Sequence, residues 1–328
     1  MIKNNKVMVL MATYNGTKFI KEQLDSIFDQ VDVETTLLVR DDGSTDDTMD
    51  ILTKYAERRS IIIIKSQKND LHGPMNNYYA LIKFAQDNYA NLFDYFAFAD
   101  QDDVWRLDKL STMIKQIPDL HTPQLAYCNH EIIDENGDVL IPSVNEQIGL
   151  LPENNEALLY TNSFAWGHSI VFNSKLLSEI CMSKLVCSSN FPHDAYFAKF
   201  AVLTHGIKFV PNVLVSYRRY KNNVSQMWYR LSFSQIQSYI KHESIIYANV
   251  VNTTLMTCRE NQYCPFVDKS LLLQTMNNIN RGGIKVLVYF FRNKIKRQQF
   301  SRTISLYLVY GIKIYKHYIG KASKIMTN

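Results

Sequence analysis

Short apolar runs alternate with stretches of helical periodicity along the first 120 residues. Apolar residues three and four positions apart predict helices after Thr17, after Ser44 or Thr45, and again from about Met75. Thr17 and the Ser44/Thr45 pair are the expected helix caps. The order predicts an α/β fold made of βαβ units around a parallel sheet. The predicted strands are VMVLMA (7–12), TLLVR (36–40), IIIIK (61–65) and YFAFA (95–99).

The pattern is mixed between residues 120 and 225. QLAYCNHEII and VLI, separated by DENGD, predict a β-hairpin that turns at Asn136-Gly137. SIVF then predicts a strand, residues 193–204 a helix, and KFVPNVLVSYRRY a last long strand. From about residue 228 the chain has the periodicity of helices that carry basic and aromatic side chains. We therefore expect a domain over residues 1–225 and a mainly helical region over residues 226–328.

Three polar clusters follow predicted strands: ATYNG (12–16), DDGSTDDT (41–48) and DQDD (100–103). Right-handed crossovers place the carboxyl ends of parallel strands at one edge of the sheet, where ligands bind in open α/β folds. We therefore expect the three clusters to converge on one site. No GxGxxG or Walker P-loop is present, which argues against dinucleotide or ATP binding of those kinds.

The DQDD cluster is the most specific chemical signal. Asp100, Asp102 and Asp103 directly follow an apolar run, and three like charges there need a positive partner. Hard carboxylate oxygens suit Mg²⁺ or Mn²⁺, which keep open positions for water and substrate phosphates. The alternative is an acidic loop closed by Asx turns. In DDGSTDDT, Gly43 permits a tight turn, and an aspartate before it is free to accept hydrogen bonds from a base or ribose.

The net charge of the chain is +5, but the charged residues are distributed unevenly along it. Residues 1–227 contain 21 Lys and Arg against 28 Asp and Glu, whereas residues 228–328 contain 15 against 3. This basic tail, residues 228–328, could bind an anionic membrane surface. Alternatively, it could form a helical bundle with a basic outer face or an oligomer contact. Nucleic acid is not expected as a partner, because the acidic body would repel it and no nucleic-acid module is present.

The five cysteines form no CxxC pair, which predicts reduced thiols. The first apolar run has no small-residue cleavage site after it, and VLVYFF (286–291) is far shorter than the roughly 20 residues that span a bilayer. We therefore expect a cytoplasmic protein, whose basic tail is the candidate for peripheral contact with the inner face of the cell membrane.

ATYNG, DDGSTDDT and ADQDDVW, in this order and spacing, resemble the family 2 glycosyltransferases with the GT-A fold. The DQDDVW form is similar to rhamnosyltransferase-like members that build bacterial surface polysaccharides. The resemblance covers about residues 6–225 and does not include the basic tail. It implies an α/β, Rossmann-like mixed sheet flanked by helices, and a metal-dependent transferase that uses nucleotide sugars. The donor-site residues that it implies are Thr13 and Tyr14 at the nucleotide base, Asp42 as acceptor from the base, Asp100 at the ribose and Asp102 on the metal.

The resemblance also implies roles on the acceptor side. WGHSIVFN (166–173) resembles the segment beneath the acceptor sugar, with Trp166 and with Gly167 for close approach. PHDAYF (192–197) resembles the segment of the catalytic base, Asp194. From the residues alone, a carboxylate near a helix start is also favoured by the helix dipole. His193 has no assigned role.

Two further positions are less definite. Asn77 stands near the family's position for a donor-pocket residue, with Asn76 as its competitor. The family often has a histidine after the last strand, where this chain has Tyr220, and this puts a third protein ligand for the metal in question. Arg218 or Arg219 could bind the leaving diphosphate through a guanidinium fork, or face solvent at the strand end.

These observations predict an inverting glycosyltransferase that requires Mn²⁺ or Mg²⁺. The donor would be dTDP-rhamnose or a UDP-sugar, and the acceptor a hydroxyl of a growing or lipid-linked surface glycan. A nucleotidyltransferase is the alternative within enzymes, although the Gly-rich loop with Arg and Lys is missing after the first strand. A non-catalytic nucleotide- or glycan-binding subunit on the same fold is the alternative from another class.

Overall fold

One mixed β-sheet organises the chain in the computed structural model, which describes residues 5–67, 70–148, 154–161, 165–189, 191–220, 236–297 and 300–317. The sheet has nine strands in this part of the chain, in the order β3-β2-β1-β4-β8-β6-β9-β5, with β7 paired to β6. The strands are β1 (Asn5–Thr13), β2 (Val33–Asp41), β3 (Ile61–Lys65), β4 (Tyr95–Ala99), β5 (Val104–Trp105), β6 (Leu125–Ile133), β7 (Val139–Ile141), β8 (Ile170–Asn173) and β9 (Ile207–Arg218).

The first four strands are parallel, as the sequence predicts. They are connected by α1 (Ile20–Phe28), α2 (Thr48–Ala56) and α3 (Pro74–Tyr89). The predicted helix caps are wrong, because α1 and α2 follow Phe19 and Asp47 without a side-chain cap. Instead, Ser44 Oγ donates to the carboxylate of Asp41. The hydroxyl therefore stabilises the loop rather than the helix.

The other half of the sheet changes direction at β8, which is antiparallel to both β4 and β6. The predicted hairpin is confirmed, since β6 pairs with β7 and Gly137 has a φ of +92° in the turn. One strand was not predicted: β5, the dipeptide Val104-Trp105, pairs with Ser216 and Val215 of β9. This pairing holds the DQDD segment beside the end of the last strand.

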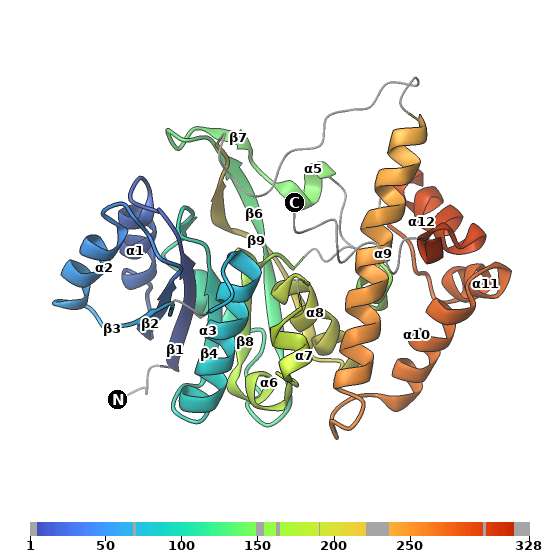
Figure 1. Ribbon diagram of the computed structural model, residues 1–328, viewed down its shortest axis with the longest axis horizontal. Helices are drawn as coiled ribbons and strands as arrows, with labels where there is room; N and C mark the ends of the chain where they lie inside the picture. Colours follow the sequence, from blue (N-terminus) through green and yellow to red (C-terminus); the bar gives the residue numbers. More distant parts are fainter. Residues whose placement is uncertain are drawn as a thin grey trace.

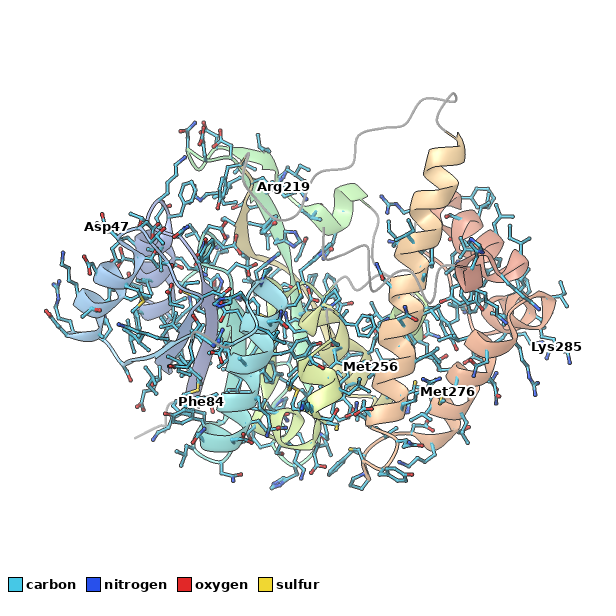
Figure 2. All side chains as sticks on the ribbon, in the orientation of Figure 1. Asp47, Phe84, Arg219, Met256, Met276 and Lys285 are labelled. Atoms are coloured by element: carbon cyan, nitrogen blue, oxygen red, sulfur yellow. The ribbon has the colours of Figure 1, made fainter. Side chains whose placement is uncertain are left out.

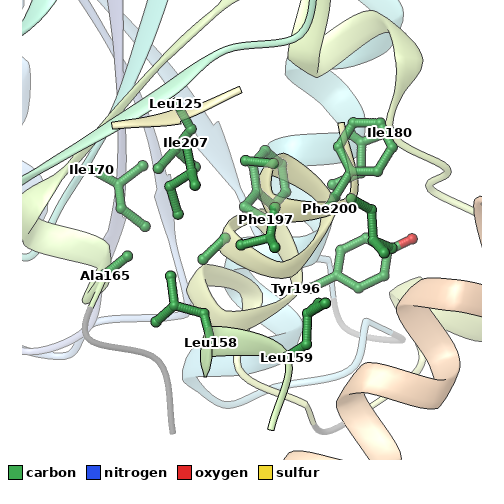
Figure 3. Packing of buried hydrophobic residues seen from close by; sticks show 14 of the residues in the cluster. Leu125, Leu158, Leu159, Ala165, Ile170, Ile180, Tyr196, Phe197, Phe200 and Ile207 are labelled. Atoms are coloured by element: carbon green, nitrogen blue, oxygen red, sulfur yellow. The ribbon is translucent and has the colours of Figure 1, made fainter. Parts of the chain in front are cut away.

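The helices after β4 fill the space around this second half of the sheet (Figure 1). Around α8, Phe197 and Phe200 pack with apolar residues of the sheet and of η1, including Leu125, Ile170 and Leu158 (Figure 3). The helix is buried along nearly its whole length, so it has no polar face. The helices are α4 (Lys109–Ile114), α5 (Val144–Ile148), η1 (Asn155–Leu159), η2 (Gly167–Ser169), α6 (Ser174–Glu179), α7 (Lys184–Cys187) and α8 (His193–Leu203).

Alternate residues of the central strands pack on opposite sides of the sheet. On β1, Met8 and Leu10 belong to the hydrophobic cluster that contains α3 and α8 residues, whereas Val7 and Val9 belong to the cluster that contains α1 residues. Since both faces are covered, the strands are apolar without alternation, as parallel sheets require.

The carboxyl-terminal helices pack against this body. They are α9 (Ile236–Glu260), α10 (Lys269–Arg281), α11 (Ile284–Arg292), α12 (Phe300–Ile312) and η4 (Ile314–His317). Figure 1 shows α9 between α8 and the helices α10, α11 and α12. Thr254 of α9 donates to the Leu159 carbonyl (2.8 Å), and Asn261 donates to the Tyr196 hydroxyl (2.9 Å). The predicted boundary between residues 225 and 226 lies outside the described residues. None of the helices in the described ranges is long and apolar enough to cross a membrane.

Candidate active site

The three polar clusters meet at the carboxyl edge of the parallel strands, as predicted. Tyr14 N–H donates to Gln101 Oε1 (2.9 Å), and Gln101 Nε2 donates back to the Tyr14 carbonyl (3.0 Å). Asn15 N–H donates to Ser44 Oγ (2.9 Å). A Cβ atom at Gly16 would lie 2.5 Å from Gln101 Oε1. This glycine therefore permits the close approach of the loops after β1 and β4.

The first cluster contains one exposed and one buried candidate. Tyr14 is 56% exposed, so its ring is open to a ligand. Thr13 is buried, and its hydroxyl donates to Asp41 Oδ2 (3.0 Å). Asp41 also accepts N–H hydrogen bonds from Gly43 (3.0 Å) and Ser44 (2.8 Å). Of the two aspartates before the turn, Asp41 is therefore the one that holds the turn together.

Asp42 lies at the other side of this turn, with little exposure. Its Oδ1 lies 3.0 Å from His72 Nδ1, and its Oδ2 accepts from Gly73 N–H (2.8 Å). Arg40 Nη1 is 3.6 Å from Oδ1. These contacts orient the carboxylate, and neither His72 nor Arg40 was singled out from the sequence.

Asn77 is buried inside the protein. Its Oδ1 accepts from Arg40 Nη1 (2.7 Å), while its Nδ2 donates to the carbonyls of Arg40 (3.1 Å) and Thr13 (3.4 Å). The amide thus connects α3 with the ends of β1 and β2. Its polar atoms are satisfied within the chain, so Asn77 supports these strand ends from inside the protein. Asn76 donates to the His72 carbonyl (2.7 Å).

The three carboxylates after β4 have different environments. Asp100 Oδ1 accepts from Tyr78 OH (2.9 Å), and Asp102 Oδ2 accepts from Tyr220 OH (2.9 Å). Asp103 is fully buried; its Oδ1 accepts from the backbone N–H of Arg218 (3.1 Å), and its Oδ2 has no hydrogen-bond partner in the part of the chain that the structure describes.

The titration of these carboxylates reflects burial and mutual repulsion. Burial and the charge of Asp100 raise the pKa of Asp102 to about 6. Burial and the charges of both neighbours raise the pKa of Asp103 well above its usual value. For Asp100, burial opposes ionisation, but the contacts with His168 and Tyr78 outweigh it and lower the pKa. The group is therefore short of positive charge, which a bound cation would supply.

His168 completes this group and was not a candidate from the sequence. Its Nδ1 lies 3.8 Å from Asp100 Oδ2 and 4.0 Å from Asp103 Oδ2. One ligand atom from each of the three residues lies within 4.8 Å of the others, a spacing that could hold a metal ion. Burial lowers the pKa of His168, which favours the neutral imidazole that binds metals. Lys109 Nζ donates to the His168 carbonyl (2.7 Å). The signal in the sequence was the WGHS segment, where only the tryptophan and glycine were considered.

The possible metal ligands differ in the solvent exposure of their side chains. The side chain of Asp100 is 38% exposed and Asp102 is partly exposed, whereas Asp103 and His168 are buried. A cation that also contacts a diphosphate must lie where the substrate can reach it. The carboxylate and imidazole donors therefore fit a divalent cation of the Mg²⁺ or Mn²⁺ type, with Asp100 and Asp102 on the open side.

Asp194 stands in the first turn of α8, as predicted. Its Oδ2 accepts from Gly167 N–H (3.1 Å), and its Oδ1 accepts from Ala195 N–H (2.6 Å). Burial raises its pKa to about 6, although both hydrogen bonds favour the ionised form. Because His168 follows Gly167 directly, one short segment contacts both Asp194 and the carboxylate group.

His193 and Trp166 form walls beside this segment. The His193 ring is buried and stacks on Tyr78 with centroids 3.9 Å apart. A Cβ atom on Gly167 would lie 3.2 Å from His193 Nε2, so the glycine again permits a close contact. Trp166 is partly exposed and packs edge-to-face on His130, with centroids 4.7 Å apart.

The two arginines after β9 differ. The Arg218 guanidinium is buried; Nε donates to the Asp102 carbonyl (3.0 Å), and Nη2 to Glu22 Oε2 (2.5 Å). It supports the DQDD loop from within the protein rather than pointing toward a ligand. Arg219 lies beside the β6–β7 hairpin (Figure 2), and its Nε and Nη1 are buried without a hydrogen-bond partner among the described residues. The Arg219 guanidinium packs over the Tyr217 ring, with its Cζ 5.8 Å from the ring centroid.

Comparison with known proteins gives the family. The sequence profile described as Glycosyl transferase family 2 matches residues 8–181. The dTDP-rhamnosyl transferase RfbG of Shigella flexneri is 43% identical over 106 residues, which are 32% of this chain and 35% of that protein. Glycosyltransferase GlyA of Streptococcus pneumoniae is 23% identical over 243 residues, 70% of this chain and 32% of that protein. The chain thus matches about a third of the length of these curated relatives.

Solved structures agree on the fold. Residues 1–349 of TarS from S. aureus, in complex with UDP-GlcNAc, superpose with a TM-score of 0.56 at 16% identity, covering 98% of this chain and 89% of that one. The mannosyltransferase PcManGT from Pyrobaculum calidifontis, in complex with GDP-Man and Mn²⁺, gives 0.51 at 13% identity, covering 98% and 88%. At these identities the similarity concerns the fold alone. The fold is of the GT-A type. Because the family profile extends over more than half of the chain, this protein belongs to glycosyl transferase family 2.

Proposed function

We propose that the protein is an inverting, metal-dependent glycosyltransferase that moves a sugar from a nucleoside-diphosphate donor to a hydroxyl of a surface glycan. The observation that carries the proposal is the Gly167-His168 segment, which joins Asp194 to the carboxylates after β4. The group of possible metal ligands suits the leaving diphosphate. The neighbouring carboxylate with a raised pKa, Asp194, suits the attacking hydroxyl.

The donor would bind across the edge of β1, β2 and β4. Tyr14 supplies an exposed ring for the nucleotide base, beside Thr13, and Asp42 is oriented by His72 to accept from the base. Asp100 would receive the ribose hydroxyls. We favour a dTDP-rhamnose donor, because a relative with that named activity matches part of the chain, and place UDP-sugars second.

A divalent cation would be held at Asp102, with Asp100, Asp103 and His168 as the surrounding donors. When bound, it would neutralise charge on the diphosphate leaving group. Arg219 would add a second positive charge to that diphosphate through its guanidinium. Tyr220 would orient Asp102 through its hydroxyl.

Asp194 would act as the general base. An acceptor hydroxyl on the Trp166-Gly167 side would lose its proton to Asp194 as its oxygen bonds to the anomeric carbon and the nucleoside diphosphate leaves from the opposite face. A carboxylate whose pKa is about 6 is ionised at neutral pH and is more basic than an exposed aspartate. The acceptor is proposed to be a growing or lipid-linked glycan, with transfer on the cytoplasmic side.

The first experiment is thermal stabilisation of the purified protein by a panel of nucleotide sugars, with and without Mn²⁺ or Mg²⁺. A metal-dependent shift with one donor supports the proposal and identifies that donor. Asp102→Asn should remove the metal-dependent shift, and Asp194→Asn should keep it while transfer is lost. Asp108→Asn, at an exposed carboxylate of the same loop region, is the matched control and should change neither.

A non-catalytic nucleotide-binding subunit is the second candidate, and the contact of Tyr220 with Asp102 favours it, because this hydrogen bond occupies an oxygen that a metal would need. In that case, a donor would stabilise the protein equally with and without metal, and Asp194→Asn would have no measurable consequence.

A further inference from the structure

Helix α11 exposes a stripe of large apolar side chains to solvent. Ile284 is 73% exposed, Val288 44% and Phe291 80%. These positions are four and three residues apart, so they lie on one face of the helix. The opposite face is used for packing, since Val286 and Phe290 are buried. The sequence of α11 is thus apolar on both faces, and only one of them has a partner among the described residues.

Helix α12 has a second such stripe, at every fourth residue. Its buried side carries Leu306 and Tyr310, which belong to the core. Its outward side carries four apolar residues, of which the first and last are 79% and 62% exposed: Phe300, Ile304, Leu308 and Ile312.

The two stripes are neighbours. Gly283, just before Ile284, donates its N–H to the Tyr310 carbonyl (2.9 Å). A Cβ atom on Gly311 would lie 3.1 Å from Leu287, so the helices touch there. The start of α11 and the end of α12 therefore meet, and both helices lie at the end of the molecule remote from β3 (Figure 1). We call the seven stripe residues of α11 and α12 the apolar face.

The charges around this face have one sign. Residues 269–328 contain 12 Lys and Arg and no Asp or Glu. Lys285, Arg292 and Lys313 directly follow the stripe residues Ile284, Phe291 and Ile312, and all three are exposed. Lys285 lies at the outer edge of the molecule (Figure 2). None of the three takes part in a salt bridge within the described part of the chain.

We propose that the apolar face docks on an anionic lipid bilayer, with α11 and α12 lying in the interface plane. The stripe residues would enter the boundary between headgroups and acyl chains, and the adjacent cations would contact lipid phosphates. This goes beyond the proposed function, since it concerns the surface at which the enzyme works and not the sugar that it transfers.

Charge argues against a second copy of the chain on the same face. A two-fold contact would bring the same patch of each subunit together. It would place the cations of one copy against those of the other, with no acidic residue in 269–328 to offset them. An anionic bilayer supplies both the apolar depth and the opposite charge.

The test is co-sedimentation of the full chain with vesicles of phosphatidylcholine alone or mixed with phosphatidylglycerol. We expect binding to the anionic vesicles at about 0.1 M salt, loss of binding at about 1 M salt, and little binding to phosphatidylcholine alone. Lys285→Gln with Arg292→Gln should weaken binding roughly 25-fold, at about fivefold for each cation. Phe291→Ser with Ile312→Ser should weaken it at least as much.

Leu185→Ser is the matched control, because Leu185 is 60% exposed on α7, outside the apolar face, and this variant should bind vesicles as the wild type does. All variants should keep the donor-induced thermal shift, so that a failure at the vesicle is distinguished from a failure of the donor site. Absence of binding to anionic vesicles overturns the proposal. So does equal weakening by Leu185→Ser, or a Phe291→Ser change that converts a dimer to a monomer in ultracentrifugation without affecting vesicle binding.

Discussion

The raised pKa of Asp194 predicts how transfer depends on pH. A general base acts only when it is ionised, and burial raises the pKa of this carboxyl from 3.8 to about 6. About nine-tenths of the protein is then active at pH 7 and about a tenth at pH 5, so kcat/KM should fall about tenfold between them. An aspartate with its ordinary pKa would lose less than about a tenth of its activity over the same range.

The raised pKa of Asp194 also predicts how the stability of the fold changes with pH. Because the pKa is higher in the folded state, the folded chain binds more protons between about pH 4 and pH 6, and stability falls as the pH rises through that window. The rise in the pKa from 3.8 to about 6 changes the free energy of unfolding by at most about 3 kcal/mol. Asp194→Asn removes this penalty at pH 8 but weakens a hydrogen bond with Gly167, at about 1–3 kcal/mol. The variant should therefore be inactive yet about as stable as the wild type at pH 8.

The assay is the initial rate of nucleoside-diphosphate release from pH 5 to pH 8, at saturating Mn²⁺ and with acceptor present. Asp102 also has a pKa of about 6, but metal binding should shift its titration to lower pH. The fall in rate that is due to protonation of Asp194 should instead occur at the same pH at every metal concentration. Enzyme held at pH 5 and assayed at pH 7.5 controls for unfolding. A flat profile between pH 5 and pH 7, or residual transfer by Asp194→Asn at the wild-type rate, would refute the assignment.

Three further substitutions test the surroundings of the site. Tyr220→His should tighten Mn²⁺ binding, measured by titration calorimetry, because an imidazole replaces a phenol that only donates to Asp102; weaker binding would contradict this arrangement. Arg218→Lys should lower the free energy of unfolding in urea by about 2 kcal/mol or more, because a lysine cannot reproduce the forked contacts of a buried guanidinium; an unchanged midpoint would contradict it. Gly167→Ala should reduce transfer more than stability, with a cost of about 1–3 kcal/mol in a thermal or urea melt, because its Cβ would press on His193; full activity would refute the close contact.

Local sequence periodicity was sufficient for most of the fold. Strands, helices and the hairpin at Gly137 are specified by neighbouring residues, and all of these elements formed where they were expected. The dipeptide strand β5, the helix caps and the short helices α4, α5, η1, η2, α6 and α7 were missed. A two-residue strand has no periodicity to detect, and Ser44 bonds to Asp41 instead of to its helix. The meeting of three polar loops could also be predicted, because parallel strands end at one edge.

The use of each polar side chain was decided only by the tertiary structure. Asn77 and Arg218 had the chemistry of ligand-binding residues, but long-range contacts with Arg40 and with the DQDD loop engage them inside the protein. His168 was passed over within the WGHS segment, and it reaches Asp100 only because β8 runs antiparallel between β4 and β6. Sequence patterns report which face of an element is apolar. They do not report which distant atom satisfies a buried polar group, because that depends on pairings between segments far apart in the sequence, such as Asn77 with Arg40, 37 residues apart, and Arg218 with Asp102, 116 residues apart.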